Sequence, residues 1–212
     1  MYTLNTQLAR EADTQSNYLT ETGKYIGRFT RAERLVSKKG TEGIGFTFEN
    51  ASKMSTKFDL WLKNASGEDL PALKTLSAIL VCLKLKDIKP APGKVERYDF
   101  ETKTKNIVDA EIFPGLLNKP IGLVFQKTEY EKMRDGALTG ETGWRLEPLV
   151  PFEAQSELTA SEILDRKTQP ERLPRVIASL ADKPLKNKSA QKPAASSANT
   201  TNSENLDEDI PF

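Results

Sequence analysis

Acidic residues that alternate along two neighbouring segments are the side chains of this sequence best suited to metal-dependent chemistry. Asp99 and Glu101 alternate with Lys103, and Asp109 and Glu111 follow on the next segment. Carboxylates beside a lysine can bind Mg²⁺ and activate water, as they do in many nucleases. A solvated strand face with cross-strand lysine partners has the same pattern, and we favour that interpretation.

The composition excludes most other catalytic chemistry. The chain has no histidine and a single cysteine, Cys82. Ser-His-Asp and Cys-His catalysis, zinc sites that use imidazole and an intrachain disulfide are therefore excluded. We predict that the protein is not an enzyme and uses no cofactor and no metal. A metal-dependent phage nuclease is the enzyme alternative. Cys82 lies in an apolar helical pattern, which predicts a core position.

Basic and aromatic side chains within residues 24–63 are suited to binding nucleic acid. This stretch holds nine Lys or Arg against four acidic residues, a local net charge of +5. Single-stranded nucleic acid is held by aromatic rings that stack on bases and by cations that follow phosphates. Trp61 alternates with Lys57 and Lys63 on the polar face of a predicted strand, where it could stack on a base or pack beneath a loop or helix. The candidate DNA-binding residues are Lys24, Arg28, Arg31, Arg34, Lys38, Lys39, Lys57, Trp61 and Lys63.

For the other aromatic residues considered, the sequence predicts a strand face or a core position. Strand alternation places Phe29 and Arg31 on one face of the first strand. Phe46 and Phe48 alternate with polar residues, which favours the core. A core position is also favoured for Trp144.

Residues 204–212 carry four carboxylates before Ile-Pro-Phe. Residues 183–203 are rich in Lys, Pro, Ala, Ser, Thr and Asn, so we expect a disordered tether there. On such a tether the carboxylates can reach a basic rim, Phe212 can fill a pocket, and its α-carboxylate can be held by an Arg or a backbone nest. An acidic solubilising tail is the alternative. The candidate partner-binding residues are Asp207, Glu208, Asp209, Ile210, Pro211 and Phe212.

The Asp209-Ile210-Pro211-Phe212 motif resembles the acidic tip of bacterial-type single-stranded DNA-binding proteins (SSBs). The body is similar to phage SSB-type proteins in Ser37-Lys38-Lys39-Gly40 followed by Gly43-Ile44-x-Phe46. The resemblance implies a protein that coats single-stranded DNA non-specifically in replication, recombination or repair. It also implies that the tip recruits helicases, nucleases or primase-type factors, and folds back on the basic groove until DNA displaces it.

Net charge keeps a second function open. The whole chain is +1, the tip is −4 and the tether is +4, which leaves the body near +1. A nearly neutral body is also compatible with a recombination mediator or adaptor that uses an SSB-like tip without strong DNA binding.

The order of predicted elements indicates an OB-fold. Strands are expected at 23–38, 44–48, 57–63, 94–104, 106–113, 120–130 and 144–152, with helices at 70–86 and 171–181 and a short helix starting at a Thr159-x-x-Glu162 capping box. Gly27 suits a bulge in the first strand, and Asp69 suits the cap of the 70–86 helix. We predict a mainly β, OB-fold-like five-stranded barrel with extra strands and helices, followed by a disordered C-terminal tail.

Three regions follow from these patterns: a single-stranded DNA-binding domain at 1–182, a linker at 183–203 and a docking tip at 204–212. No run of about 18 apolar residues and no signal-peptide pattern is present, so we expect no membrane partner and a cytoplasmic location, in the bacterial host cell if the protein is phage-encoded. The sequence is compatible with a homo-oligomer.

Overall fold

The described part of the chain is built mainly from antiparallel strands. The computed structural model describes residues 4, 6, 17–99, 102–134 and 137–185. In chain order its elements are β1 (Gly23–Val36), β2 (Glu42–Asn50), β3 (Ser55–Lys63), α2 (Ala72–Cys82), β4 (Ala91–Asp99), β5 (Thr104–Ile112), the 3-10 turn η1 (Pro114–Leu116), β6 (Pro120–Arg134), β7 (Ala137–Phe152), α3 (Ala160–Leu164) and α4 (Arg172–Ala178). The predicted mainly β class, with a helix after the third strand, is confirmed.

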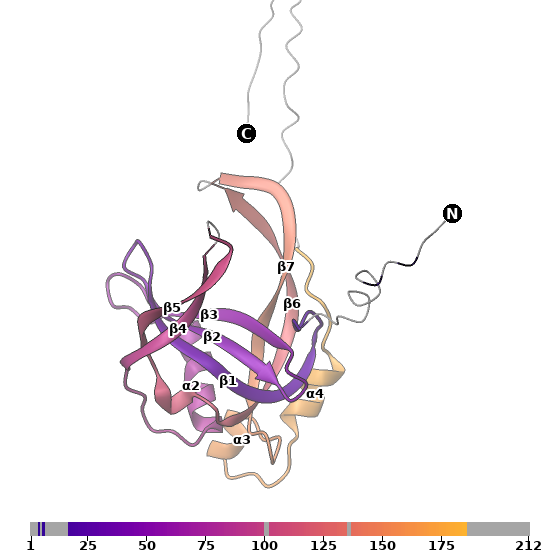
Figure 1. Ribbon diagram of the computed structural model, residues 1–212. Helices are drawn as coiled ribbons and strands as arrows, with labels where there is room; N and C mark the ends of the chain where they lie inside the picture. The colour runs from indigo at the N-terminus through magenta and orange to yellow at the C-terminus, as the bar shows by residue number, and fades with distance from the viewer. Residues whose placement is uncertain (1–3, 5, 7–16, 100–101, 135–136, 186–212) are drawn as a thin grey trace, which may run out of the picture.

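Strand β1 is the centre of the sheet. It pairs with β2 along most of its length, from Gly27 to Val36. Its other edge is divided: the segment 23–28 pairs with β6, whereas Glu33 alone pairs with β5. Strands β1, β2, β3, β6 and β7 form an OB-like barrel that α2 covers, and the β4–β5 hairpin is the added pair that stands beside it (Figure 1).

An irregularity in β1 decides which of its side chains face the core. The register against β2 shifts between Phe29 and Arg31, so that Phe29 is fully buried while Arg31 lies on the outer surface of the sheet. The prediction that these two residues share a face is wrong, and the bulge is not at Gly27. A Cβ at Gly27 would lie 2.1 Å from the carbonyl oxygen of Glu49, so close strand approach requires glycine there.

Phenylalanine rings fill the barrel. Phe29, Phe46, Phe48, Phe58 and Phe125 form one cluster with ring centroids 4.7 to 6.3 Å apart. Tilted and edge-on ring pairs at such distances are favourable, and each buried ring contributes about 1.5–3 kcal/mol. The core positions predicted for Phe46 and Phe48 are confirmed.

Helix α2 covers this cluster with Leu76, Ile79 and Cys82. Burial, aided by the nearby charge of Glu153, raises the pKa of the Cys82 thiol to about 12, which fits the predicted core position. The predicted cap by Asp69 is wrong. Pro71 occupies the N-cap, and the Asp69 carboxylate instead lies 3.1 Å from the Lys63 ammonium.

Strands β6 and β7 form a long hairpin whose outer half projects beyond the barrel (Figure 1). Its base is part of the barrel, and Val124 and Phe152 there are buried against Leu173 of α4, in a cluster separate from the phenylalanine rings. Trp144 belongs to the projecting half and is 45% exposed, with the Lys127 Nζ atom 5.7 Å from its ring centroid. The core position favoured for Trp144 is therefore wrong, because this part of β7 has no barrel beneath it.

The carboxylate of Glu162 joins the two short helices. It accepts hydrogen bonds from the Thr159 amide and hydroxyl at 2.8 Å and from the Glu171 and Arg172 amides at 2.7 Å. The predicted capping box is confirmed. Burial opposes ionisation, but these hydrogen bonds outweigh it and lower the pKa of Glu162 to about 2.

The chain after α4 returns to the hairpin. The Lys183 amide donates to the Lys127 carbonyl at 2.8 Å, and the Glu129 amide donates to the Lys183 carbonyl at 2.9 Å. Lys183 is therefore part of the body, one residue beyond the predicted boundary at 182. The rest of the tether predicted at 183–203, from residue 186 onward, and the tip at 204–212 lie outside the described residues. Among the described residues no helix has the length and apolar character needed to cross a membrane.

Replacing Glu162 with Ala should destabilise the protein by roughly 3 kcal/mol at pH 7, the free energy that corresponds to its lowered pKa. A lowered folded-state pKa stabilises the fold above the unfolded-state pKa. The difference between wild type and Glu162→Ala should therefore shrink as pH falls from about 4.5 toward about 2. Urea unfolding across this range measures it. Glu171→Ala, which removes an exposed ion pair with Lys167, is the control and should cost less than about 1 kcal/mol. An equal loss in both variants would contradict the role assigned to Glu162.

Candidate nucleic-acid interface

The surface of β1–β3 that faces away from the core, which we call the outer face, is organised in cross-strand rows. One row joins Arg31, Thr47 and Lys57, the next joins Glu33, Gly45 and Asp59, and the third joins Leu35, Gly43 and Trp61. The alternate positions on β3, Phe58 and Leu60, are buried in the core. Strand alternation therefore places Lys57 and Trp61 on one surface, as predicted.

Glycines in the middle strand shape this face. A Cβ at Gly43 would lie 2.9 Å from the Trp61 ring, and a Cβ at Gly45 would lie 3.0 Å from the Asp59 carboxylate and 3.3 Å from the Arg31 guanidinium. The side chains of β1 and β3 therefore lie close over β2. Trp61 is half-buried, with its ring against backbone on one side.

A buried carboxylate holds the polar groups of the outer face in place. Glu33 is 1% exposed and accepts hydrogen bonds from Arg31, with Nε at 2.8 Å, and from Arg97 on β4. Burial opposes ionisation of Glu33, but the hydrogen bonds from Arg97 and Arg31 outweigh it and lower its pKa. A buried charge is tolerated only when it is paired in this way, so Glu33 fixes both guanidinium groups.

A groove lies between the outer face and the β4–β5 hairpin. Its volume is about 520 Å³, and we call it the outer-face groove. Its floor is the β1–β3 sheet together with Tyr18, which pairs with Ser55, and the β4–β5 hairpin forms its wall. Residues that carry charge or an aromatic ring along it are Tyr18, Arg31, Glu49, Lys57, Lys94, Glu96, Tyr98 and Lys105.

This groove has the chemistry that single strands require. Lys57 and Lys94 make no ion pair with any carboxylate of the described residues, whereas Lys105 pairs with Glu96 at 2.8 Å. Tyr18 is 65% exposed and Tyr98 is 48% exposed. Exposed rings beside unpaired ammonium groups can stack on bases and contact phosphates.

The structure brings together only some of the predicted residues. Arg31, Lys57 and Trp61 share the outer face. Lys38 and Lys39 are exposed in the β1–β2 turn. The other predicted cations are paired with carboxylates: Lys24 with Glu157 at 2.6 Å, Arg28 with Glu49 at 3.1 Å, Arg34 with Glu111 at 2.6 Å and Glu42 at 3.2 Å, and Lys63 with Asp69 at 3.1 Å. The +5 stretch is therefore partly neutralised by carboxylates from other segments.

Sequence reasoning missed the residues on the second wall. Lys94, Glu96 and Tyr98 alternate along β4, and their alternation is visible in the sequence. Nothing in the sequence indicates that this hairpin stands over the outer face, because that placement depends on Glu33 and on the pairing of β5 with β1.

The acidic residues first considered for metal chemistry do not form a metal site among the described residues, where no group of three or more His, Cys, Asp or Glu is placed to hold an ion. Asp109 stands opposite Lys94 in the hairpin, and Glu111 pairs with Arg34. Glu101 lies outside the described residues.

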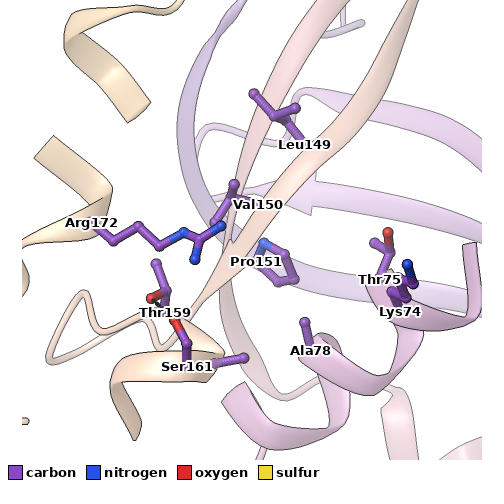
Figure 2. A pocket seen from close by; sticks show the side chains of 10 residues that line it. Lys74, Thr75, Ala78, Leu149, Val150, Pro151, Thr159, Ser161 and Arg172 are labelled. Carbon is purple, nitrogen blue, oxygen red and sulfur yellow. Dashed lines mark hydrogen bonds between the residues drawn. The ribbon is translucent and has the colours of Figure 1, made fainter. Parts of the chain in front are cut away.

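A second hollow of about 300 Å³ lies between α2, β7 and α3 (Figure 2). Lys74 stands on one side of it and Arg172 on the other, above Val150 and Pro151. No aromatic side chain lines it, so it lacks the stacking surface that the outer-face groove offers.

Comparisons with known proteins give no assignment. The chain matches no protein-family model, and a search of curated proteins finds no significant match. Any function must therefore be argued from the outer-face groove and from the sequence.

Replacing Glu33 with Ala should destabilise the protein by about 1–3 kcal/mol at pH 7, because two guanidinium groups lose their buried acceptor. A lowered pKa means that the stabilisation by Glu33 is present above the unfolded-state pKa and is lost as pH falls through the folded-state pKa. Urea unfolding at pH 7 and in acid measures both effects. The control is Glu42→Ala, which removes one exposed partner of Arg34 and should cost less than about 1 kcal/mol. A Glu33→Ala protein as stable as Glu42→Ala would contradict this assignment.

Proposed function

We propose that this protein binds single-stranded DNA without sequence preference and coats it during replication, recombination or repair. The observation that carries the proposal is the outer-face groove, where Lys57 and Lys94 lie among the exposed rings of Tyr18 and Tyr98. Phosphates carry no sequence and every base has a face that can stack, so this chemistry predicts binding that depends little on sequence.

The position of the groove supports the proposal. In OB-folds the surface of the second and third strands, with the loops beside it, is a common binding site for oligonucleotides. In this chain β2 and β3 present Thr47, Lys57 and Trp61 on that surface. The fold alone does not assign a function, and the argument rests on the groove's side chains.

We further propose that residues 204–212 recruit partner enzymes, as the SSB resemblance implies. Asp207, Glu208 and Asp209 would steer the segment toward a basic surface, while Ile210, Pro211 and Phe212 would bury apolar area there. Pro211 restricts the chain and so lowers the entropy lost on docking.

One observation favours a different function. Lys24, Arg28, Arg34 and Lys63 are already paired with carboxylates, so these four predicted cations are less able to contact phosphates. A recombination mediator or adaptor would need only the docking segment, and it would show no strong binding to single strands.

Titration with labelled oligo(dT) and with a duplex of equal length tests DNA binding. We expect tighter binding to the single strand and a loss of affinity with salt. Lys57→Ala should weaken binding and reduce the magnitude of the salt slope by about 0.7, the value for one phosphate contact on a single strand. The matched control is Lys167→Ala, which lies in the α3–α4 segment and pairs with Glu171; it should leave both quantities unchanged. Equal affinity for duplex and single strand would refute the proposal, and binding to neither would favour the adaptor.

A pull-down from a bacterial lysate tests the docking segment. Phe212→Ala should remove the captured partners, because the ring supplies most of the buried apolar area, whereas Asp207→Asn should only weaken capture and make it less sensitive to salt. Neither variant should lower the affinity for oligo(dT). Identical partner sets from wild type and Phe212→Ala would leave these residues as a solubilising segment.

A further inference from the structure

The β4–β5 hairpin is attached to the barrel at one end only. Its strands pair with each other from Ala91–Ile112 to Asp99–Thr104, but Glu33–Ile112 is the one pair in the register between β5 and β1. Ion pairs hold it in addition: Arg97 binds Glu33, and Glu111 lies 2.6 Å from Arg34. The hairpin is therefore a separate two-stranded layer, fixed at its base and bound to the outer face through charged groups.

The hairpin contributes charged, aromatic and apolar side chains to the outer-face groove. Lys94, Glu96, Tyr98 and Lys105 line the outer-face groove. Ile107, which pairs with Glu96 in the register and so lies on the same side of the hairpin, is 72% exposed and does not line the groove. Val95, which is 6% exposed, and Ile112 line the groove as well, so the hairpin presents charged and aromatic groups there beside a small apolar contact.

The space between the two layers limits what can enter. Packed β-layers lie about 10 Å apart, and a hollow of about 520 Å³ is the size of a small-ligand site. A base and its phosphate fit such a space when they come from a single strand. A duplex would have to displace the hairpin, which would break the Arg97–Glu33 pair.

We propose that the β4–β5 hairpin is a roof that closes over a single strand and so determines the preference for single-stranded over duplex nucleic acid. This inference rests on the proposed function. Tyr98 stacks on a base from above, Lys94 contacts the adjacent phosphate, and Lys57 and Tyr18 contact the same strand from below. The Arg97–Glu33 ion pair holds the hairpin at a distance from the sheet that admits one DNA strand.

Photocrosslinking maps the position of the strand directly. Oligo(dT) with 5-bromodeoxyuridine is bound to the full-length protein and irradiated, and tryptic peptides are identified by mass. Trypsin cleavage after Arg97 and Lys103 gives a roof peptide, residues 98–103. Cleavage after Arg10 and Lys24 gives a floor peptide, residues 11–24 with Tyr18, and cleavage after Lys57 and Lys63 gives an open-face peptide, residues 58–63 with Trp61. A roofed strand labels the roof peptide and the floor peptide. A strand that lies on an open face labels 58–63 alone, and that result would overturn the proposal.

Point variants test the preference itself. Tyr98→Ala should weaken oligo(dT) binding roughly tenfold while changing duplex binding little, so the ratio of the two affinities falls. Arg97→Ala should lower the same ratio by loosening the roof. The matched control is Ile107→Ala, on the same hairpin but outside the groove, which should keep the wild-type ratio.

The outcomes separate the two proposals. If wild-type protein shows no preference for the single strand, the proposed function itself fails. If the wild type shows the preference but Tyr98→Ala and Arg97→Ala keep it, the hairpin is not the selecting element and only the further inference fails. Circular dichroism of each variant verifies that the fold is intact. If Arg97→Ala does not fold, Tyr98→Ala and the crosslinking result decide.

Discussion

The irregularity of β1 between Phe29 and Arg31 is the constraint on which the rest of the structure depends. Strand β1 places Phe29 in the core and Arg31 and Glu33 on the outer face. Its second edge pairs partly with β6 and partly with β5. Without a register shift, strand alternation would place Phe29 and Arg31 on the same surface. The shift therefore creates both the aromatic core and the polar outer face from one continuous strand.

Glu33 links the shifted register of β1 to the candidate site. It is almost completely buried, yet it remains ionised because Arg31 and Arg97 donate to both of its oxygens. Its position on β1 follows from the shifted register, and Arg97 reaches it from β4. A buried charge with two partners is a costly feature for stability alone, but it defines the distance between hairpin and sheet.

Many cations of the barrel surface are paired with carboxylates, and this pairing, not an excess of positive charge, characterises the surface. Arg34 contacts two carboxylates, from β2 and β5, and three other predicted DNA-binding cations, Lys24, Arg28 and Lys63, each pair with one. Exposed pairs of this kind contribute little stability, although they reduce the long-range attraction of the surface for phosphates. Local binding then depends on the few cations left unpaired beside aromatic rings, of which Lys57 and Lys94 line the outer-face groove.

Much of the fold could be predicted from local patterns, and the groove could not. Alternation predicted core positions for Phe46 and Phe48, and the capping box at Thr159 could be predicted because its chemistry is local. The face on which Arg31 lies depends on a register shift that no glycine in the sequence marks. The exposure of Trp144 depends on how far the β6–β7 hairpin projects beyond the barrel. The wall formed by Lys94 and Tyr98 depended on contacts with β1, far away in the sequence.

The most direct test of the central claim is to record backbone amide NMR spectra of the full-length protein during addition of oligo(dT). Binding in the outer-face groove predicts shifts concentrated on β1–β3 around Arg31, Lys57 and Trp61 and on β4–β5 around Lys94 and Tyr98, with little change in α3 and α4. No shifts on addition of a large excess, or shifts centred on the α2–β7–α3 hollow while the outer face is unchanged, would contradict the account.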